Sequence, residues 1–331
     1  MKKALVIGID DYQGQKALKC CVNDATEVAK LLNRNEDKTL NFEVQLLTSR
    51  TASLTNGLLA DTISRFFKSG TNVDTAVLYF AGHGVISPQT DAGYVLGIDA
   101  CKGNWGVPLS ELLGLANDAH DRIHSSVIIL DCCHAGTAGE VAGMKSSASV
   151  IGPGVTILTS CNEDEKAKEG HEHGIFTDLL LDGLGGGCAD IRGNVTPAAL
   201  YAHIDQTLGA DAQRPLYKAN VQQFVTLRQV QPKIPHDVLL NLPVYFPDSD
   251  MVYPLDPSYE PDRKSVAEEF KNLPVNDEHV AIFKQLQKCN RQGLIDPVGV
   301  EHMFDAAMQS TGCRLTPIGK HYRRLAQLNK I

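Results

Sequence analysis

Short runs of consecutive apolar residues recur through the first two thirds of the chain, and segments with a helical pattern separate them. Continuous runs, without alternation, are typical of strands that are covered on both faces. This order of strands and helices predicts an α/β fold with a mainly parallel central sheet flanked by helices and connected by right-handed crossovers. The expected strands are residues 4–9, 42–47, 76–81, 126–130, 155–159 and 224–228.

Polar residues that favour helix N-termini precede three of the helical segments. Asn23 or Asp24 is expected to cap a helix that runs to residue 32, Thr55 one that runs to residue 67, and Thr196 one that runs to residue 208. Helices at these places would connect the parallel strands.

Two of the apolar runs end at reactive side chains. Gly82-His83-Gly84 follows the run at 76–81, and Asp131-Cys132-Cys133 follows the run at 126–130. In an open α/β sheet, ligands bind beyond the carboxyl ends of the strands, so a His and a Cys there can meet as base and nucleophile. Successive strand residues face opposite sides, so only one of the two cysteines can enter the cleft. The separation of about fifty residues matches the His-before-Cys spacing of caspase-type peptidases.

Four motifs of this chain resemble motifs of the caspase-like peptidase superfamily and occur in the same order as in that family. The resemblance is closest to the metacaspase and bacterial caspase-homologue branch. The resemblance extends over residues 1 to about 229. It implies a caspase-like sandwich and a cysteine endopeptidase that acts on protein or peptide substrates without a cofactor. The motifs are Tyr79-Phe80-Ala81-Gly82-His83-Gly84, Asp131-Cys132-Cys133-His134-Ala135-Gly136, Cys21-Val22-Asn23-Asp24, and a stretch from Thr159-Ser160-Cys161 to Gly174-Ile175-Phe176-Thr177.

The resemblance also assigns catalytic roles. In the family an aspartate lies two positions before the nucleophile, which selects Cys133 over Cys132. His83 then takes the thiol proton and later protonates the departing amine, because a protonated thiol is a poor nucleophile. The backbone N–H groups of Cys133 and Gly84 match the family's donors to the oxyanion.

Acidic residues near both motifs indicate a specificity for basic substrates. Asp24 and Asp131, together with Cys21, match positions that line the S1 pocket of metacaspases, where Arg or Lys is selected. A carboxylate in a desolvated slot favours a guanidinium. Specificity for aspartate would need arginines there, and none flanks either motif. Asp24 can instead be an ordinary helix N-cap, and Asp131 a polar residue at a strand end.

Other segments near the expected site carry weaker signals. Lys145, in a segment rich in Gly, Ala and Ser, is a candidate P1 residue for self-cleavage. The charged run 163–169 is either a solvated loop or a wall of the substrate groove. Asp91 and Asp99 are the only acids in 85–101, and calcium needs six to eight oxygen ligands. We therefore expect no metal site and no calcium activation.

The composition sets outer limits on function. With 43% apolar and 21% charged residues, the chain is typical of a soluble globular protein. Its net charge of -8 argues against general binding of polyanions, so DNA is not an expected partner. Nine cysteines without a Cys-x-x-Cys pair fit neither a disulfide framework nor a zinc ribbon. With no apolar stretch long enough for a signal peptide or a membrane span, this composition predicts a reducing, cytoplasmic setting.

The chain is expected to divide into a peptidase domain at 1–229, a packed connector at 230–265 and a helical C-terminal region at 266–331. Seven prolines make the connector extended and irregular. Helices are expected at 278–286, 298–309 and 317–328. Four basic residues cluster at the last of them: Lys320, Arg323, Arg324 and Lys330.

The C-terminal helices permit four interpretations: a helix-turn-helix-like DNA reader, a protein docking module, a pocket for a small signalling molecule, or a helical cap on the peptidase. Bacterial caspase homologues that resemble this chain are often effectors of defence, including antiviral defence, or of cell death. A small nucleotide messenger sensed by this region is the preferred candidate activator. The alternatives are a catalytically silent caspase-like scaffold and a regulator that binds DNA or protein. The sequence indicates neither a natural substrate nor an oligomeric state.

Overall fold

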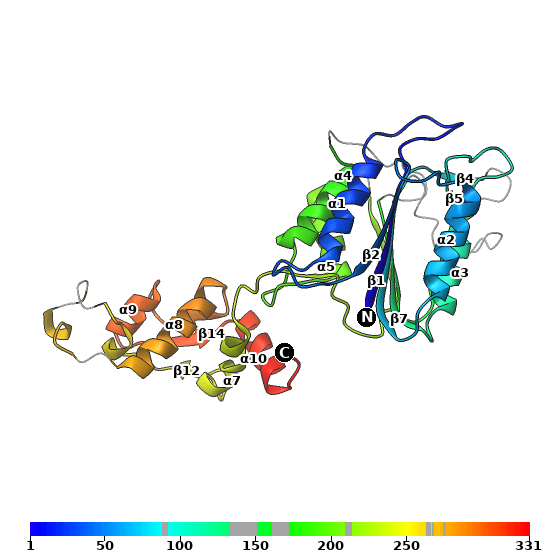
Figure 1. Cartoon of the computed structure of the whole chain (residues 1–331). Helices are drawn as coiled ribbons and strands as arrows, with labels where there is room; N and C mark the ends of the chain where they lie inside the picture. The colour runs from blue at the N-terminus through cyan, green and yellow to red at the C-terminus, as the bar shows by residue number, and fades with distance from the viewer. Residues whose placement is uncertain are drawn as a thin grey trace. The chain divides into compact units, whose positions relative to one another are not determined.

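The structure is a computed structural model that describes residues 1–87, 92–132, 151–160, 172–208, 214–262, 266, 268–273 and 276–331. The chain forms two compact units, Met1–Gln231 and Pro232–Ile331 (Figure 1). Within the described residues, no helix combines the length and the apolar character that crossing a membrane requires.

A six-stranded sheet in the order β10-β8-β7-β3-β1-β2 forms the centre of the first unit. Five neighbouring strands run parallel, and β10 is antiparallel to β8 at the edge. The expected mainly parallel sheet is therefore confirmed. The strands are β1 (Lys2–Gly8), β2 (Glu43–Thr48), β3 (Val73–Ala81), β7 (Ile123–Asp131), β8 (Val155–Thr159) and β10 (Leu216–Ala219).

Helices cover both faces of this sheet, as Figure 1 shows. Strand β1 illustrates why its run is continuously apolar. Leu5 and Ile7 pack in a cluster with α2 (Asn56–Lys68) and α3 (Leu109–Asp118). Ala4 and Val6 pack on the opposite face with α1 (Cys21–Asn33), α4 (Ile175–Asp182) and α5 (Pro197–Leu208). Because successive side chains alternate between faces, both sets of positions must be apolar.

The helix starts agree with the expectation at two of three places. Thr55 and Thr196 cap α2 and α5 with their hydroxyl groups. Helix α1 begins earlier than expected, with Cys20 at the N-cap position and no hydrogen bond from its side chain. The carboxylate of Asp10 accepts the N–H of the second residue of α1 at 3.2 Å instead. The N-cap interpretation of Asp24 is therefore wrong, since its side chain bonds outside its own helix.

The sixth strand of the sheet is not the one expected at 224–228. Strand β10 takes that place, and its side chains are only partly buried, so it has no continuous apolar run to reveal it. In the expected segment, Phe224 is 69% exposed. Only β11 (Arg228–Gln229) forms there, and it pairs with β9 (Asn194–Val195) in a separate two-stranded sheet.

Shorter elements complete the first unit. Strands β4 (Gly84–Ile86), β5 (Gly93–Val95) and β6 (Val107–Pro108) form an antiparallel sheet that begins directly after His83. A π-helical segment, Gly183–Gly187, extends α4.

The second unit combines helices with a three-stranded sheet in the order β12-β14-β13. The proline-rich stretch expected as a connector contributes α6, α7 and β12 to this unit, and the division of the chain falls after residue 231. The first and last expected C-terminal helices are present, whereas the middle one is short. The elements are α6 (His236–Leu240), α7 (Leu242–Tyr245), β12 (Val252–Tyr253), 3-10 turns at Pro257–Tyr259 and Glu268–Phe270, α8 (Asp277–Arg291), β13 (Ile295–Pro297), α9 (Met303–Met308), β14 (Cys313–Leu315) and α10 (Pro317–Gln327).

Candidate active site

The carboxyl ends of β3 and β7 lie side by side. Ala81 and Asp131 are register partners in the parallel pair, and the Gly82 N–H donates to the Asp131 carbonyl at 3.3 Å. His83 and Cys132 thus follow the ends of neighbouring strands at the same edge of the sheet. Cys133, the expected nucleophile and oxyanion donor, lies outside the described residues, as do Asp91, Lys145 and the charged run 163–169.

The other cysteine of the pair, Cys132, is a core residue. It is 1% exposed and belongs to the apolar cluster on the α2 and α3 face of the sheet. Asp131 instead bonds to Thr177 of α4, on the other face. The alternation of strand side chains therefore separates Asp131 from Cys132.

His83 is oriented by hydrogen bonds to the loop between β1 and α1. Its Nε2 lies 2.6 Å from the backbone carbonyl of Lys16. Because a carbonyl oxygen only accepts hydrogen bonds, Nε2 carries the proton of the neutral imidazole, and Nδ1 carries the lone pair. The tautomer assigned from this contact makes Nδ1 the basic atom of the ring.

Tyr12 of the same loop holds the backbone of His83. The Tyr12 hydroxyl accepts the His83 N–H at 2.8 Å, and the two rings lie 4.6 Å apart at 53°. Burial raises the pKa of Tyr12 well above its ordinary value, so the hydroxyl stays protonated. A Cβ atom at Gly82 would lie 2.5 Å from this hydroxyl, which explains the glycine before His83. Gly84, the other expected oxyanion donor, begins β4 immediately after the histidine.

Asp24 and Asp131 converge on Gly174, at the N-terminus of α4. A Cβ atom at Gly174 would lie 2.8 Å from Asp131 Oδ2 and 3.3 Å from Asp24 Oδ2. The Gly174 N–H lies 3.2 and 3.3 Å from the two carboxylate oxygens of Asp24. Both aspartates are buried. The structure thus brings together two carboxylates that the sequence places more than one hundred residues apart.

The pKa of Asp24 is raised to about 7, first by burial and also by the nearby charge of Asp131, while hydrogen bonds from His173 and Gly174 act in the opposite direction. Two carboxylates that are buried together disfavour each other's charge. This part of the site therefore favours a cation that would neutralise them.

Thr177 and Tyr79 form a chain of hydrogen bonds that ends at the Asp131 carboxylate. The Thr177 hydroxyl donates to Asp131 Oδ2 at 2.7 Å, and the Tyr79 hydroxyl lies 2.6 Å from the same Thr177 oxygen. Since the one Thr177 proton is used, Tyr79 must be the donor to Thr177. Burial, followed by the charge of Asp131, raises the pKa of Tyr79 well above its ordinary value, which keeps it a neutral donor.

His173 contacts Asp24 directly. The distance from His173 Nδ1 to Asp24 Oδ1 is 2.7 Å. The side chain of Asn23 donates to the Glu172 carbonyl at 3.0 Å and thereby holds the adjacent backbone against α1. The polar residues at the start of α1 thus bind the segment before α4 instead of capping their own helix.

Cys21, the third expected S1 residue, opens α1 in a buried position. It belongs to the same apolar cluster as Tyr79. Its carbonyl oxygen would lie 2.3 Å from a Cβ atom at Gly8, so α1 and β1 approach each other closely at this residue. Cys21 thus packs where the start of α1 meets β1.

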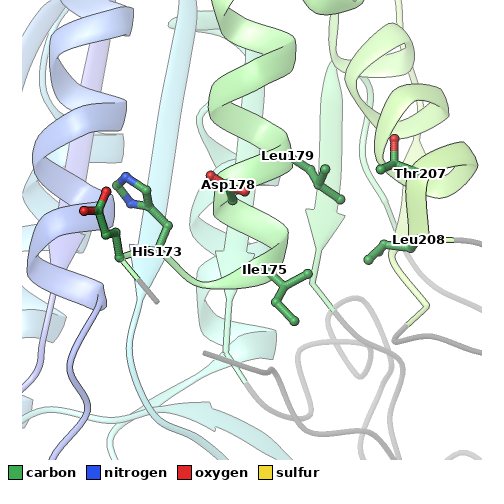
Figure 2. Close-up of a pocket in the computed structure, with 7 residues that line it drawn as sticks. His173, Ile175, Asp178, Leu179, Thr207 and Leu208 are labelled. Carbon is green, nitrogen blue, oxygen red and sulfur yellow. The ribbon is translucent and has the colours of Figure 1, made fainter. Parts of the chain in front are cut away.

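A hollow of about 490 Å³ adjoins this arrangement, between the start of α4 and the end of α5 (Figure 2). His173 lines it on one side, and two further acids of the segment and of α4, Glu172 and Asp178, line it as well. The remaining lining residues are Ile175, Leu179, Thr207 and Leu208.

The part of the chain that the structure describes contains no group of three His, Cys, Asp or Glu side chains placed to hold a metal ion. Asp99, one of the two acids weighed for calcium, accepts the N–H of Asn56 at 2.6 Å. Its carboxylate therefore has a structural partner at the start of α2.

Sequence reasoning missed Tyr12, Lys16 and His173 as site residues. Lys16 acts through its backbone carbonyl, which no sequence pattern reveals. Tyr12 lies in a loop just after the apolar run that ends at Asp10. Its closeness to the end of an expected strand was the only indication in the sequence of a role in the site. His173 directly precedes the glycine of the Gly174-to-Thr177 motif, and this adjacency could have drawn attention to it.

A family model described as the caspase domain matches residues 1–225. The chain belongs to the caspase domain family. Its first unit is accordingly a caspase-like peptidase domain, and caspase-like proteases act on protein substrates. A search of curated proteins finds no match.

Solved structures agree on the caspase fold. A protein from Geobacter sulfurreducens is similar at 16% identity, with a TM-score of 0.51, over 70% of this chain and 99% of its own. Caspase-1 from Spodoptera frugiperda is similar at 13% identity, also with a TM-score of 0.51, over 70% of this chain and 90% of its own. At these identities the likeness concerns the fold alone.

Proposed function

We propose that the chain is a cysteine endopeptidase that uses His83 and Cys133 and cleaves after Arg or Lys. One observation carries this proposal. His83 stands at the end of β3 with its Nε2 bonded to the Lys16 carbonyl, and β3 is in register with the strand that leads to Cys133. A base that is oriented by a third group is the arrangement that activates a nucleophile.

In the proposed mechanism, His83 Nδ1 takes the proton of the Cys133 thiol. The thiolate attacks the carbonyl carbon of the scissile peptide bond, and the carbonyl π electrons move to its oxygen. When the tetrahedral intermediate collapses, the C–N bond breaks and the His83 imidazolium gives its proton to the leaving amine. Water, deprotonated by the same imidazole, then hydrolyses the thioester and restores the thiol.

Backbone N–H groups of Gly84 and Cys133 would stabilise the oxyanion in this mechanism. The support for this assignment is positional, because each group belongs to a residue at or next to the proposed dyad. Removal of one such donor in other enzymes slows the reaction by about 100-fold to 1000-fold.

The proposed S1 specificity rests on the burial of Asp24 and Asp131. Two carboxylates that share one desolvated site cannot both ionise without a cation nearby. The guanidinium of arginine or the ammonium of lysine at P1 would supply that charge, and a guanidinium would add bidentate hydrogen bonds. An acidic P1 side chain would add a third negative charge to the same site.

A panel of fluorogenic peptides with Arg, Lys, Leu or Asp at P1 tests the proposal. We expect cleavage after Arg and Lys only, loss of turnover in Cys133→Ala and His83→Ala, and most of the activity retained in Cys132→Ala. Activity that survives in Cys133→Ala but not in Cys132→Ala would overturn the assignment of the nucleophile. Faster cleavage after Asp than after Arg would overturn the S1 assignment.

We also propose that the second unit regulates this activity and that a small nucleotide messenger activates the enzyme in a bacterial defence or cell-death response. The support is that residues 232–331 form a compact unit of their own, beyond the matched caspase domain. A ligand of this unit could favour a competent conformation of the peptidase.

Incubation of the full chain with a nucleotide library, with cleavage of the P1-Arg peptide as readout, tests this regulation. We expect a stimulated rate with one class of nucleotide and no stimulation in Cys133→Ala. Full activity that no nucleotide changes would contradict the proposed regulation while leaving the peptidase assignment intact.

A further inference from the structure

We propose that His173 is a built-in competitor for the S1 pocket: its imidazole binds the Asp24 carboxylate that a basic P1 side chain must reach, so a substrate has to displace it. This inference rests on the proposed S1 role of Asp24. It makes His173 a specificity-determining residue that acts before the chemical steps.

The contact between His173 and Asp24 is close and shielded from solvent. Nδ1 lies 2.7 Å from Asp24 Oδ1, and the side chains are 17% and 2% exposed. Asn23 bonds to the backbone just before His173, which holds the imidazole near α1. The pair is therefore part of the folded site and not a chance encounter of two surface side chains.

The charges around His173 explain why an imidazole is held there. Asp24 of α1 and Asp131 of β7 form the buried acidic pair, while Glu172 of the same segment and Asp178 of α4 line the adjoining hollow. These acidic groups come from α1, β7, α4 and the segment before α4, whereas α5 contributes only Thr207 and Leu208 to the hollow. The imidazole N–H in this position donates to one of these carboxylates, as the P1 cation of a substrate would.

The geometry makes the imidazole and a P1 cation mutually exclusive at Asp24. The carboxylate already accepts from His173 and from the Gly174 N–H, and almost none of its surface is exposed. A guanidinium that is to form two hydrogen bonds with Asp24 needs the oxygen that His173 occupies. Binding of arginine at P1 thus requires the imidazole to leave.

The hollow beside His173 gives the displaced ring a place to go. Figure 2 shows His173 at one border of this space, with Asp178 and Leu179 of α4 farther along it. The hollow measures about 490 Å³, which exceeds the volume of an imidazole several times, and its two carboxylates would accept a hydrogen bond from the ring. Displacement thus moves the imidazole from one acidic partner to others.

Competition of this kind sharpens selectivity. A P1 side chain must bind Asp24 better than the resident imidazole does, which guanidinium and ammonium groups can and neutral side chains cannot. Specificity is a difference of affinities. An internal competitor excludes P1 side chains whose affinity for Asp24 is lower than that of the imidazole.

Agmatine, whose guanidinium mimics the arginine side chain, is a direct probe of this competition. The full chain carrying Cys133→Ala is titrated with agmatine at pH 8, and the Cε1–H signal of His173 is followed by NMR. We expect the signal to move to the position of an imidazole released from Asp24. In His173→Gln, whose amide can still donate to Asp24 without a charge, agmatine should bind about tenfold more tightly, a ratio that corresponds to about 1.4 kcal/mol.

His203→Ala is the matched control, since His203 Nε2 also lies 2.7 Å from an aspartate, Asp182, at the far end of α4. It should leave agmatine binding unchanged. With active enzyme, His173→Gln should lower KM for the P1-Arg peptide and leave kcat unchanged, which a merely structural role would not do.

Agmatine that binds the parent protein and His173→Gln equally well, or the variant more weakly, would overturn the inference and leave the S1 proposal standing. Agmatine that binds neither protein would overturn the S1 role of Asp24, and the inference with it. The glutamine variant keeps a hydrogen bond to the buried carboxylate, so the test does not depend on the folding of His173→Ala.

Discussion

Replacement of Asp24 by asparagine is expected to stabilise the first unit above pH 7 while reducing cleavage after arginine. The side chain is 1% exposed and shares its surroundings with Asp131. Asparagine has nearly the same shape but no charge, so it removes the cost of keeping a carboxylate out of water. Function and stability should therefore change in opposite directions at this position.

The size of the effect follows from the pKa of Asp24. Its folded value of about 7 compares with an ordinary value of 3.8. At about 1.4 kcal/mol per pH unit, this difference makes the folded state less stable above pH 7 by about 4 kcal/mol at most. The substitution also lowers the free energy of unfolding by about 1 to 2 kcal/mol, because the single amide oxygen of asparagine replaces two carboxylate oxygens that accept hydrogen bonds. A net gain of about 2 to 3 kcal/mol remains.

The raised pKa also sets the direction of the pH dependence. Below pH 3.8, Asp24 is protonated in the folded and unfolded states, and its contribution to stability is fully present. That contribution is lost as the pH rises through 7, because the unfolded chain releases the proton more readily. Asp24→Asn lacks this titration, so it should be about 1 to 2 kcal/mol less stable than the parent near pH 4 and should become the more stable protein as the pH rises to about 8.

Hydrogen exchange of peptides from β3 and β7 measures the stability of the first unit alone and avoids the assumption that the two units unfold together. Exchange at pH 5, 6.5 and 8, corrected for the intrinsic rate, should show the stability of Asp24→Asn relative to the parent rising with pH. Asp61→Asn, which neutralises an exposed aspartate of α2, is the control and should change little. Equal stabilities of Asp24→Asn and the parent at every pH would refute the reasoning. In the same variant, kcat/KM for the P1-Arg peptide should fall about 10-fold to 100-fold.

Three further substitutions probe the supports of the site and the second unit. Tyr12→Phe removes the acceptor of the His83 N–H and should lower kcat for the P1-Arg peptide about tenfold, with a displaced pH profile; an unchanged profile would argue against a positioning role. Gly174→Ala places a methyl group 2.8 Å from Asp131 Oδ2 and should raise KM for P1-Arg peptides more than it lowers kcat, so equal effects on both would count against the S1 assignment. Arg323→Met unpairs two backbone carbonyls of the 246–247 segment and should destabilise α10 by about 1 to 3 kcal/mol in hydrogen exchange, whereas an unchanged α10 would show that these bonds contribute little.

The parallel sheet could be predicted because its strands leave a strong signal in the sequence. Strands that are buried on both faces need apolar residues at every position, and five of the six expected strands are present. Strand β10 escaped prediction for the opposite reason. As an edge strand with partly buried side chains, it carries mixed residues such as Tyr217 and Lys218.

In the C-terminal region, the strands escaped prediction because they are short. Strands β12, β13 and β14 have two or three residues each, too few for any periodicity to appear. Helix α10 has a clear 3.6-residue pattern and lies where the sequence predicts it. Length and regularity, and not the region of the chain, decided which elements were predictable.

From the sequence alone, the five parallel strands of the central sheet, the glycines that flank His83, and the positions of His83 and Asp131 at strand ends could be predicted, because each depends on neighbouring residues. The bond between the Lys16 carbonyl and His83 Nε2 and the contact between His173 and Asp24 became evident only in three dimensions. These contacts join residues that are 67 and 149 positions apart, and a backbone carbonyl has no residue type by which it can be recognised. The partner of a buried charge depends on which loops the fold brings beside it, and that choice is made in three dimensions.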